Sequence, residues 1–293
     1  MKVLAIDGGG IRGLIPALVL AEIERRTGRR IGELVDLIAG TSTGAIIACA
    51  VAKPRPMAAE RIADLYVEEG PRIFDRSLLK RITSAEGLLD ERYDSKGLVA
   101  ALERYLGSAR LADASPPVLL TAYDLERRRA VYLRSSSDDA SMVDAAHASA
   151  AAPTYFEPVR IGGATLVDGG VFAINPAMCG YAEVDGALEL LLSLGTGEHT
   201  RSLPYEDVRG WGKVEWARPI IDVVFDGIAD AVDEQLTALL DDLYVRLQTP
   251  LDEASDDLDD ASEENLSALR REAERLIAAR DDEIDRVCER LLR

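Results

Sequence analysis

Short runs of aliphatic and β-branched residues, bounded by Gly, Pro or Asp, alternate along the chain with longer stretches of helical periodicity. The runs typical of strands are residues 2–7, 35–40, 118–123, 130–134, 165–168 and 188–194. Helical patterns cover residues 14–26, 43–52, 57–69, 95–106, 175–184 and 219–244. Strands and helices that alternate in this way predict an α/β protein, a three-layer α/β/α fold with a mainly parallel central sheet.

The C-terminal part of the chain has a different pattern. Residues 252–264 carry eight carboxylates and no lysine or arginine, which is typical of a solvated loop. From Leu266 to Leu291, apolar residues recur mostly every three or four positions and predict one amphipathic helix. Because no internal repeat or low-complexity linker separates these parts, we expect residues 1–250 to form the main domain and residues 251–293 to pack onto it.

Residues 71–93 combine an apolar pattern with positive charge. Arg72, Arg76, Lys80 and Arg81 are interleaved with isoleucines, leucines and a phenylalanine in an otherwise acidic chain. This composition resembles a segment that lies in a membrane interface. A surface helix with its cations in water is the simpler interpretation, and the sequence leaves both open.

Composition narrows the class of protein. A net charge of −18 argues against nucleic acid as a partner and against simple electrostatic adhesion to anionic lipid. No run approaches the ~18 apolar residues of a membrane span. The opening MKVLAIDGGG is typical of a strand that enters a turn rather than of a signal peptide. We therefore expect a cytoplasmic protein that contacts a membrane at most peripherally.

Ser42 stands in the pentapeptide GTSTG, where the strand-like VDLIAG meets the helix-like AIIACAVA. In a Gly-x-Ser-x-Gly turn the serine is exposed between strand and helix, and Gly40 and Gly44 remove the Cβ atoms that would otherwise clash. The N-terminus of the following helix also directs partial positive charge at the serine. Ordinary strand-to-helix loops use the same residue types, so the pentapeptide alone leaves a catalytic role open.

A second glycine-rich turn follows the first predicted strand. Glycines 8–10 follow Asp7, and with Gly13 they satisfy the Gly-x-Gly-x-x-Gly pattern of dinucleotide-binding domains. That interpretation requires an acidic residue near the end of the second strand, whereas Asp36 stands at its start. The other use of consecutive glycines is a set of backbone N–H groups that converge on an anion, as in an oxyanion hole.

A serine nucleophile needs a base, and the chain has two histidines. His147 lies in an alanine-rich, helix-like segment, whereas His199 follows the strand-like run 188–194. The order Ser42, Asp168, His199 is that of α/β-hydrolases, although Ser42 comes early in the chain for that fold. A triad of these three residues therefore stays open.

Asp168 is the other candidate base. It ends the strand-like run 165–168, and Gly169 and Gly170 permit a sharp turn that would present its carboxylate to a cleft. A purely structural Asp-Gly turn is the alternative.

Taken together, DGGGIRG at 7–13, GTSTG at 40–44, ASAAAPTYFEP at 148–158 and DGG at 168–170 resemble the patatin-like phospholipase family. Residues 210–244 resemble bacterial members of that family, and we expect this chain to be of the bacterial type. The resemblance implies a Ser-Asp dyad with Ser42 as nucleophile and Asp168 as base. It also implies an oxyanion hole built from the backbone N–H groups of Gly8, Gly9 and Gly10. Arg12 would support the loop that carries these glycines.

The resemblance further implies a lipid acyl hydrolase, of phospholipase A, lysophospholipase or esterase type, that works through an acyl-enzyme without metal or cofactor. Its substrates would be phospholipids, galactolipids or lysolipids, reached through transient contact of residues 71–93 with a membrane surface. A catalytically inactive binding protein of the same fold is an alternative, and so is an enzyme switched on by an activator or by oligomerisation.

Overall fold

A computed structural model of the chain describes residues 1–75, 79–83, 89–198, 200, 202–216 and 219–293, with the backbone alone for 79–83 and 89–92. Its main sheet has the strand order β10-β9-β1-β2-β5-β8-β7, with β6 beside β5. The strands are β1 (Lys2–Ile6), β2 (Leu37–Gly40), β5 (Val118–Asp124), β6 (Arg129–Arg134), β7 (Val159–Ile161), β8 (Ala164–Asp168), β9 (Leu190–Leu194) and β10 (Tyr244–Leu247).

The pairing of these strands confirms a mainly parallel sheet. β10, β9, β1, β2 and β5 run parallel to one another, whereas β6 and β8 pair antiparallel with β5, and β7 pairs antiparallel with β8. The parallel strands end at one edge of the sheet, so the loops that follow β1, β2 and β9 lie next to one another. Ligand sites of open α/β sheets form at that edge.

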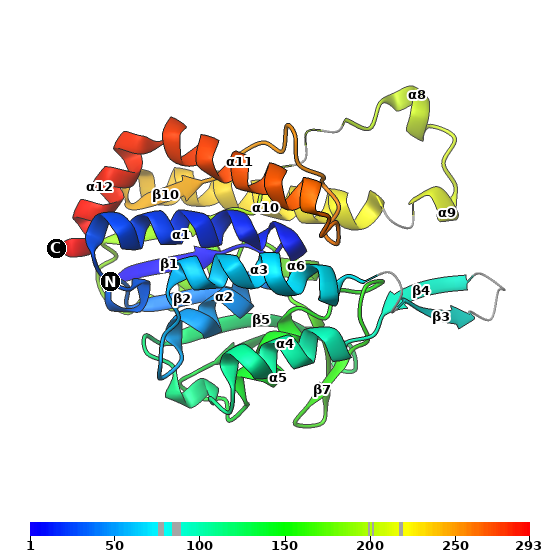
Figure 1. The fold of residues 1–293 in the computed structure, drawn as a ribbon, viewed down its shortest axis with the longest axis horizontal. Coiled ribbons are helices and arrows are strands. Elements are labelled where there is room, and N and C mark those ends of the chain that lie inside the picture. Colours follow the sequence, from blue (N-terminus) through cyan, green and yellow to red (C-terminus); the bar gives the residue numbers. More distant parts are fainter. Residues whose placement is uncertain (76–78, 84–88, 199, 201, 217–218) are drawn as a thin grey trace.

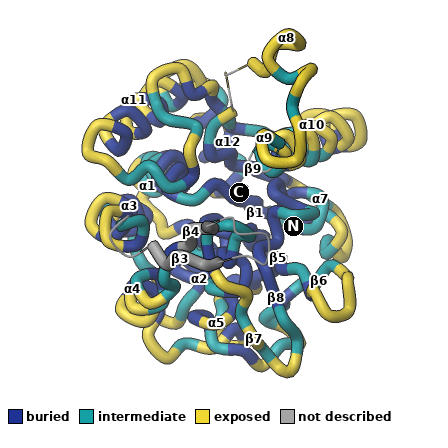
Figure 2. The backbone as a smooth tube through the Cα atoms, turned by 90° about the vertical axis from the view of Figure 1, so that its right-hand side faces the viewer, coloured by how far each residue is buried: buried dark blue, intermediate teal, exposed yellow. Residues whose placement is uncertain are grey.

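Helices cover both faces of the sheet, as Figures 1 and 2 show. One face carries α1 (Leu14–Thr27), α2 (Thr43–Ala52), α3 (Ala59–Ile73), α4 (Lys96–Leu106), α5 (Met142–Ser149), α11 (Glu263–Ala279) and α12 (Asp281–Leu292). The other carries α6 (Gly170–Ala173), α7 (Ala177–Ala182) and α10 (Pro219–Leu240). The remaining helices are short: η1 (Gly10–Gly13), η2 (Ile31–Glu33), η4 (Leu111–Asp113), η5 (Asp241–Leu243), α8 (Tyr205–Val208) and α9 (Lys213–Trp216).

The alternation of side chains along β1 explains why helices cover both faces of the sheet. Leu4 and Ile6 are buried on the α1 and α2 side, whereas Val3 and Ala5 are buried in a separate cluster with residues of α7 and α10. Successive strand side chains point to opposite faces, so a strand that is apolar throughout needs helices on both. The three-layer α/β/α fold predicted from the sequence is confirmed. No helix within the described ranges has the length and apolarity needed to cross a bilayer.

Two predicted helices differ from the structure. The helix expected over 219–244 ends at Leu240; η5 follows, with Asp241 at a φ of 49°, and Tyr244–Leu247 forms β10 against β9. Val245 and Leu247 pack on the main core and Tyr244 packs on the opposite cluster, as the two faces of a strand require. Pairing with the buried strand β9 outweighs the helical pattern that precedes it.

The single C-terminal helix expected over 266–291 is two helices that break at Arg280. Asp281 opens the second, α12, where acidic residues are favourable at a helix N-terminus. The break also brings Asp281 and Asp285 to Arg26 of α1, each at 2.6 Å.

Over its described residues, the interface-like segment 71–93 forms no single surface helix. It contains the end of α3 and a hairpin of β3 (Leu79–Thr83) and β4 (Leu89–Tyr93), which projects from the body of the protein in Figure 1. At the base of the hairpin, the Phe74 and Tyr93 rings pack edge to face with centroids 5.6 Å apart. Residues 76–78 and 84–88 lie outside the described residues.

The acidic stretch 252–264 is more than a solvated loop. Leu258 is buried, and its carbonyl accepts a hydrogen bond from the Ile11 N–H at 2.9 Å. The Tyr93 hydroxyl donates to Asp259 at 2.8 Å. This stretch therefore folds over the glycine-rich turn that follows β1, and one apolar residue inside a charged run anchors it there.

Candidate active site

Ser42 joins β2 to α2 in a conformation that few residues adopt. Its φ of 56° and ψ of −120° lie in a region where side chains other than hydrogen are strained, at a cost of about 1–3 kcal/mol. The Ser42 N–H donates to the Ser149 hydroxyl at 2.9 Å, which holds the turn. A Cβ at Gly40 would lie 2.5 Å from the carbonyl oxygen of Gly44, and one at Gly44 would run into the Ile6 carbonyl. Both glycines are therefore required for the sharp turn that presents Ser42.

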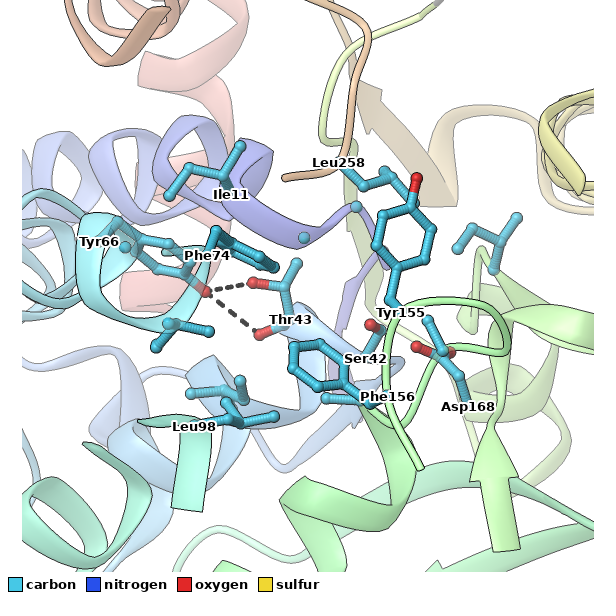
Figure 3. A pocket seen from close by; sticks show the side chains of 18 of the residues that line it. Ile11, Ser42, Thr43, Tyr66, Phe74, Leu98, Tyr155, Phe156, Asp168 and Leu258 are labelled. Carbon is cyan, nitrogen blue, oxygen red and sulfur yellow. Dashed lines mark hydrogen bonds between the residues drawn. The ribbon is translucent and has the colours of Figure 1, made fainter. Parts of the chain in front are cut away.

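Asp168 ends β8, and its carboxylate faces the Ser42 hydroxyl in Figure 3. The residue is 2% exposed, and the Gly170 N–H donates to its Oδ1 at 2.7 Å. Burial raises the pKa of Asp168 to about 7, although hydrogen bonds from Ser42 and Gly170 lower it in part. A carboxylate with that pKa can accept a proton close to neutral pH. Gly169 is needed because a Cβ there would overlap Thr121.

The glycine-rich turn lies on the other side of Ser42. Gly9 and Gly10 line the cavity that contains Ser42 and Asp168, and within the described chain neither N–H donates to a protein group. The Gly8 N–H is different, because it donates to the Ile174 carbonyl at 2.9 Å. The Gly8 N–H is thus engaged within the fold, and the oxyanion role expected for it stays a prediction; Gly9 and Gly10 are the candidate donors whose N–H groups have no protein acceptor in the described chain.

Arg12 holds this turn from inside the protein. It is 4% exposed, and its Nε donates to the Gly9 carbonyl at 3.4 Å. That bond fixes the peptide that follows Gly9, whose N–H belongs to Gly10. Gly13 lies one turn further on, where a Cβ would collide with the Thr43 and Tyr66 side chains.

The cavity beside Ser42 measures about 720 Å³, counted with its opening to solvent. Its polar groups gather around Ser42, Asp168 and the glycine turn, and the rest of the wall is apolar or aromatic (Figure 3). The apolar and aromatic residues are Ile11, Ile46, Leu65, Tyr66, Ile73, Phe74, Leu98, Ala150, Ala152, Tyr155, Phe156, Ile174, Phe225 and Leu258. Such a cavity suits a substrate with a long apolar part and one polar reacting group.

Most of the residues that form this wall could not be identified from the sequence. Ile174, Phe225 and Leu258 come from segments far apart in the chain, and each looks like an ordinary core residue in its local pattern. Tyr155 and Phe156 lie in the ASAAAPTYFEP motif, so that motif was the available signal.

The two histidines do not enter the described site. His147 lies on α5, as expected from its helix-like context, and no histidine is among the described residues that line the cavity. His199 lies outside the described residues. The Ser42-Asp168-His199 triad therefore stays a prediction.

We expect Gly10→Ala to lower esterase activity by about 10²-fold or more, because a Cβ at its φ of 57° would strike the Leu258 carbonyl and displace a candidate oxyanion donor. Gly28→Ala is the matched control: Gly28 has a φ of 68° but open space around its Cβ position. Gly28→Ala should lower the free energy of unfolding by about 1 kcal/mol and leave kcat unchanged. Thermal unfolding and hydrolysis of a soluble ester, measured on both variants, test this; equal activities would contradict it.

Comparison with known proteins supplies the family. Residues 4–178 match the family model for patatin-like phospholipase. The chain is 32% identical to patatin-like protein 2 of Arabidopsis thaliana and 30% identical to patatin-04/09 of Solanum tuberosum, in each case over 94% of this chain and 83% of the relative. It is also 31% identical to a Solanum tuberosum protein named probable inactive patatin-3-Kuras 1, over 94% of this chain and 86% of the relative. The bacterial type expected from residues 210–244 stays a prediction. With its mostly parallel sheet, flanking helices and these matches, the chain belongs to the patatin-like phospholipase family.

Proposed function

We propose that this protein hydrolyses carboxylic esters of lipids, as a phospholipase A, lysophospholipase or esterase that uses Ser42 and Asp168 as a dyad. The observation that carries the proposal is the Ser42 hydroxyl facing a buried carboxylate, Asp168, whose pKa is raised to about 7, inside an apolar cavity. A carboxylate with its ordinary pKa would be a poor base for a serine hydroxyl, and burial corrects part of that mismatch.

The chemistry follows from these groups. The Ser42 Oγ attacks the ester carbonyl carbon while Asp168 takes the hydroxyl proton. The Gly9 and Gly10 N–H groups stabilise the oxyanion, each by about 3 kcal/mol when well aligned. As the intermediate collapses, the leaving alcohol takes the proton from Asp168. Water then attacks the acyl-enzyme with Asp168 again as base, and Ser42 is restored.

The apolar wall supports lipids as the substrate class. An acyl chain placed among residues such as Leu98 and Tyr66 would remove apolar surface from water, at about 25 cal/mol per Å². This binding energy also positions the ester beside Ser42, which lowers the entropic cost of the reaction.

Release of fatty acid from defined phospholipids, galactolipids and lysolipids is the direct test of the proposal. A fluorophosphonate probe should also label the purified protein on the peptide that contains Ser42, because such probes react with activated serines. An inactive binding protein of the same fold would release no fatty acid from any of these lipids and would not be labelled.

We further propose that segment 71–93 brings the cavity to a membrane surface. Phe74, which lines the cavity, lies at the C-terminal end of α3, and its ring contacts Tyr93 at the end of β4. A hairpin whose strands carry Leu79, Ile82 and Leu89 among charged residues could enter the interface beside the opening and give substrate a short path out of the bilayer.

The double substitution Ile82→Glu and Leu89→Glu is therefore expected to lower hydrolysis of phospholipid vesicles about tenfold while hydrolysis of a soluble short-chain ester stays within about twofold. Leu239→Glu, at an exposed position near the end of α10, is the matched control and should change neither rate. Equal losses on vesicles and on the soluble ester would argue against a docking role.

A further inference from the structure

Thr196 lies in the turn that follows β9 and packs against the glycine-rich turn that follows β1. It is 3% exposed, and its hydroxyl donates to the Gly8 carbonyl at 2.7 Å. A Cβ at Gly9 would overlap the Thr196 side chain, so the two turns touch with no room for another group. The two bonded residues are 188 positions apart in the chain. Neither the strand β9 nor the proposed dyad accounts for this buried hydroxyl.

The bond to the Gly8 carbonyl also orients the Gly9 N–H, because both groups belong to one peptide unit. A peptide unit is planar and trans, so its C=O and N–H point in opposite directions. Among the described residues, Gly9 lines the cavity of Ser42, whereas Thr196 lines a separate cavity on the other side of the turn. A carbonyl held from that side directs the Gly9 N–H toward the cavity of Ser42.

The next peptide unit of the turn is held in the same way. Its carbonyl is that of Gly9, which accepts the Arg12 Nε at 3.4 Å and the Arg12 N–H at 3.1 Å, and its N–H is that of Gly10. Each candidate oxyanion donor therefore has the carbonyl of its own peptide unit bonded from behind. A hydrogen bond to the carbonyl polarises a peptide unit and makes its N–H a stronger donor.

The turn that carries Thr196 is itself fixed on both sides. The Gly195 N–H donates to the Leu247 carbonyl at 2.9 Å, and the Gly197 N–H donates to the Gln248 Oε1 at 2.8 Å. Both acceptors belong to β10 or to the residue that follows it. The Thr196 hydroxyl is therefore held in place before any substrate arrives, as electrostatic stabilisation of a transition state requires.

We propose that Thr196 is a positioning residue of the oxyanion hole, whose hydroxyl aligns the Gly9 N–H with the oxygen that gains charge when Ser42 attacks the ester. The inference rests on the proposed function and adds one residue to it. No proton passes through Thr196, and no bond to it forms or breaks. Because Thr196 acts through Gly9 from outside the substrate cavity, loss of its hydroxyl weakens transition-state binding and leaves substrate binding unchanged.

Thr196→Val is the first test, because valine keeps the shape of the side chain and removes the hydroxyl. The kcat for p-nitrophenyl butyrate is expected to fall about tenfold while KM stays within about twofold. Outright loss of an oxyanion donor costs about 10²-fold or more, and here the Gly9 N–H remains but loses its alignment. Thr196→Ser, which keeps the hydroxyl, should retain kcat within about threefold.

An inhibitor separates positioning from a purely structural role. A trifluoromethyl ketone with a short alkyl chain forms a tetrahedral adduct with an activated serine, and the adduct carries an oxyanion. Thr196→Val should raise the Ki of this ketone about tenfold, in step with the loss of kcat/KM. A variant that merely contains less folded protein would lose kcat and keep the wild-type Ki.

Thr249→Val is the matched control. It removes the hydroxyl of another buried threonine, whose Oγ1 donates to the Pro250 carbonyl at 3.4 Å and not to the glycine turn, so kcat and Ki should not change. If Thr196→Val folds poorly, Thr196→Ala and Thr196→Ser differ by the hydroxyl alone and repeat the comparison. Thermal unfolding reports the fold of each variant.

The outcomes distinguish this inference from the proposed function. If the wild type hydrolyses butyrate and Thr196→Val keeps its kcat, or loses kcat with an unchanged Ki, the inference is overturned and the proposed function stands. Equal losses in Thr196→Ser and Thr196→Val would also overturn it. If the wild type hydrolyses no ester, the proposed function fails and the inference falls with it.

Discussion

Replacing Ser42 by alanine is expected to abolish acyl hydrolysis, with kcat/KM reduced by a factor on the order of 10⁴ or more. The substitution removes the only atom that the proposed mechanism uses to form the acyl-enzyme, and the residual rate would come from the oxyanion donors acting on water. Fatty-acid release and fluorophosphonate labelling measure the loss, while thermal unfolding verifies that the variant is folded.

Ser42→Gly provides the control for structure. At a φ of 56° glycine is unstrained, so this variant should be as inactive as Ser42→Ala but more stable than it, by about 1 kcal/mol. A Ser42→Ala protein that keeps more than a tenth of the wild-type rate would contradict the assignment of the nucleophile.

Asp168→Asn is expected to lower kcat about 10³-fold or more, because an amide retains the shape of the side chain but accepts no proton. The wild-type rate should also depend on pH through this group. With the pKa of Asp168 raised to about 7, kcat should fall about tenfold per pH unit below 7 and level off above it. An activity that stays constant between pH 5 and pH 8 would contradict a base with this pKa.

The raised pKa of Asp168 also predicts how stability depends on pH, in the direction opposite to that of kcat. The folded-state pKa of Asp168, about 7, exceeds its ordinary value of 3.8, so the folded protein binds a proton that the unfolded chain has released. The stabilisation that comes from keeping this proton on Asp168 is fully present below pH 4 and is lost as the pH rises to 7. Asp168→Asn should therefore be more stable than the wild type at pH 8, on the order of a few kcal/mol, and equal to it near pH 4. Urea unfolding at both values measures the difference.

The histidines distinguish the dyad from a triad. Neither His147→Ala nor His199→Ala is expected to lower kcat more than about threefold, since the proposed base is Asp168. His147→Ala serves as the control, because His147 lies on α5 and is not among the residues lining the cavity. Loss of turnover in His199→Ala alone, with the fold intact, would support the Ser42-Asp168-His199 triad instead.

Local sequence determined the elements that carry the chemistry. GTSTG specifies a turn at Ser42 because only glycine fits at positions 40 and 44, two residues to either side of it, and β1 specifies a buried strand because it is apolar on both faces. Together with the alternation of strands and helices, these patterns were enough for a three-layer α/β/α fold. In each case the physical reason is local, either a steric limit within a few residues or the period of a strand.

Only the tertiary structure decided what depends on contacts between distant segments. The Gly8 N–H is occupied because Ile174 lies beside it, and Leu258 reaches the glycine turn from an acidic loop almost 250 residues further along the chain. The strand β10 exists because β9 offers an edge for pairing, although the preceding pattern favours a helix. The raised pKa of Asp168 likewise depends on how completely neighbouring segments exclude water. Hydrogen-bond engagement, strand pairing and desolvation are set by packing across the fold, and no local pattern of residues records them.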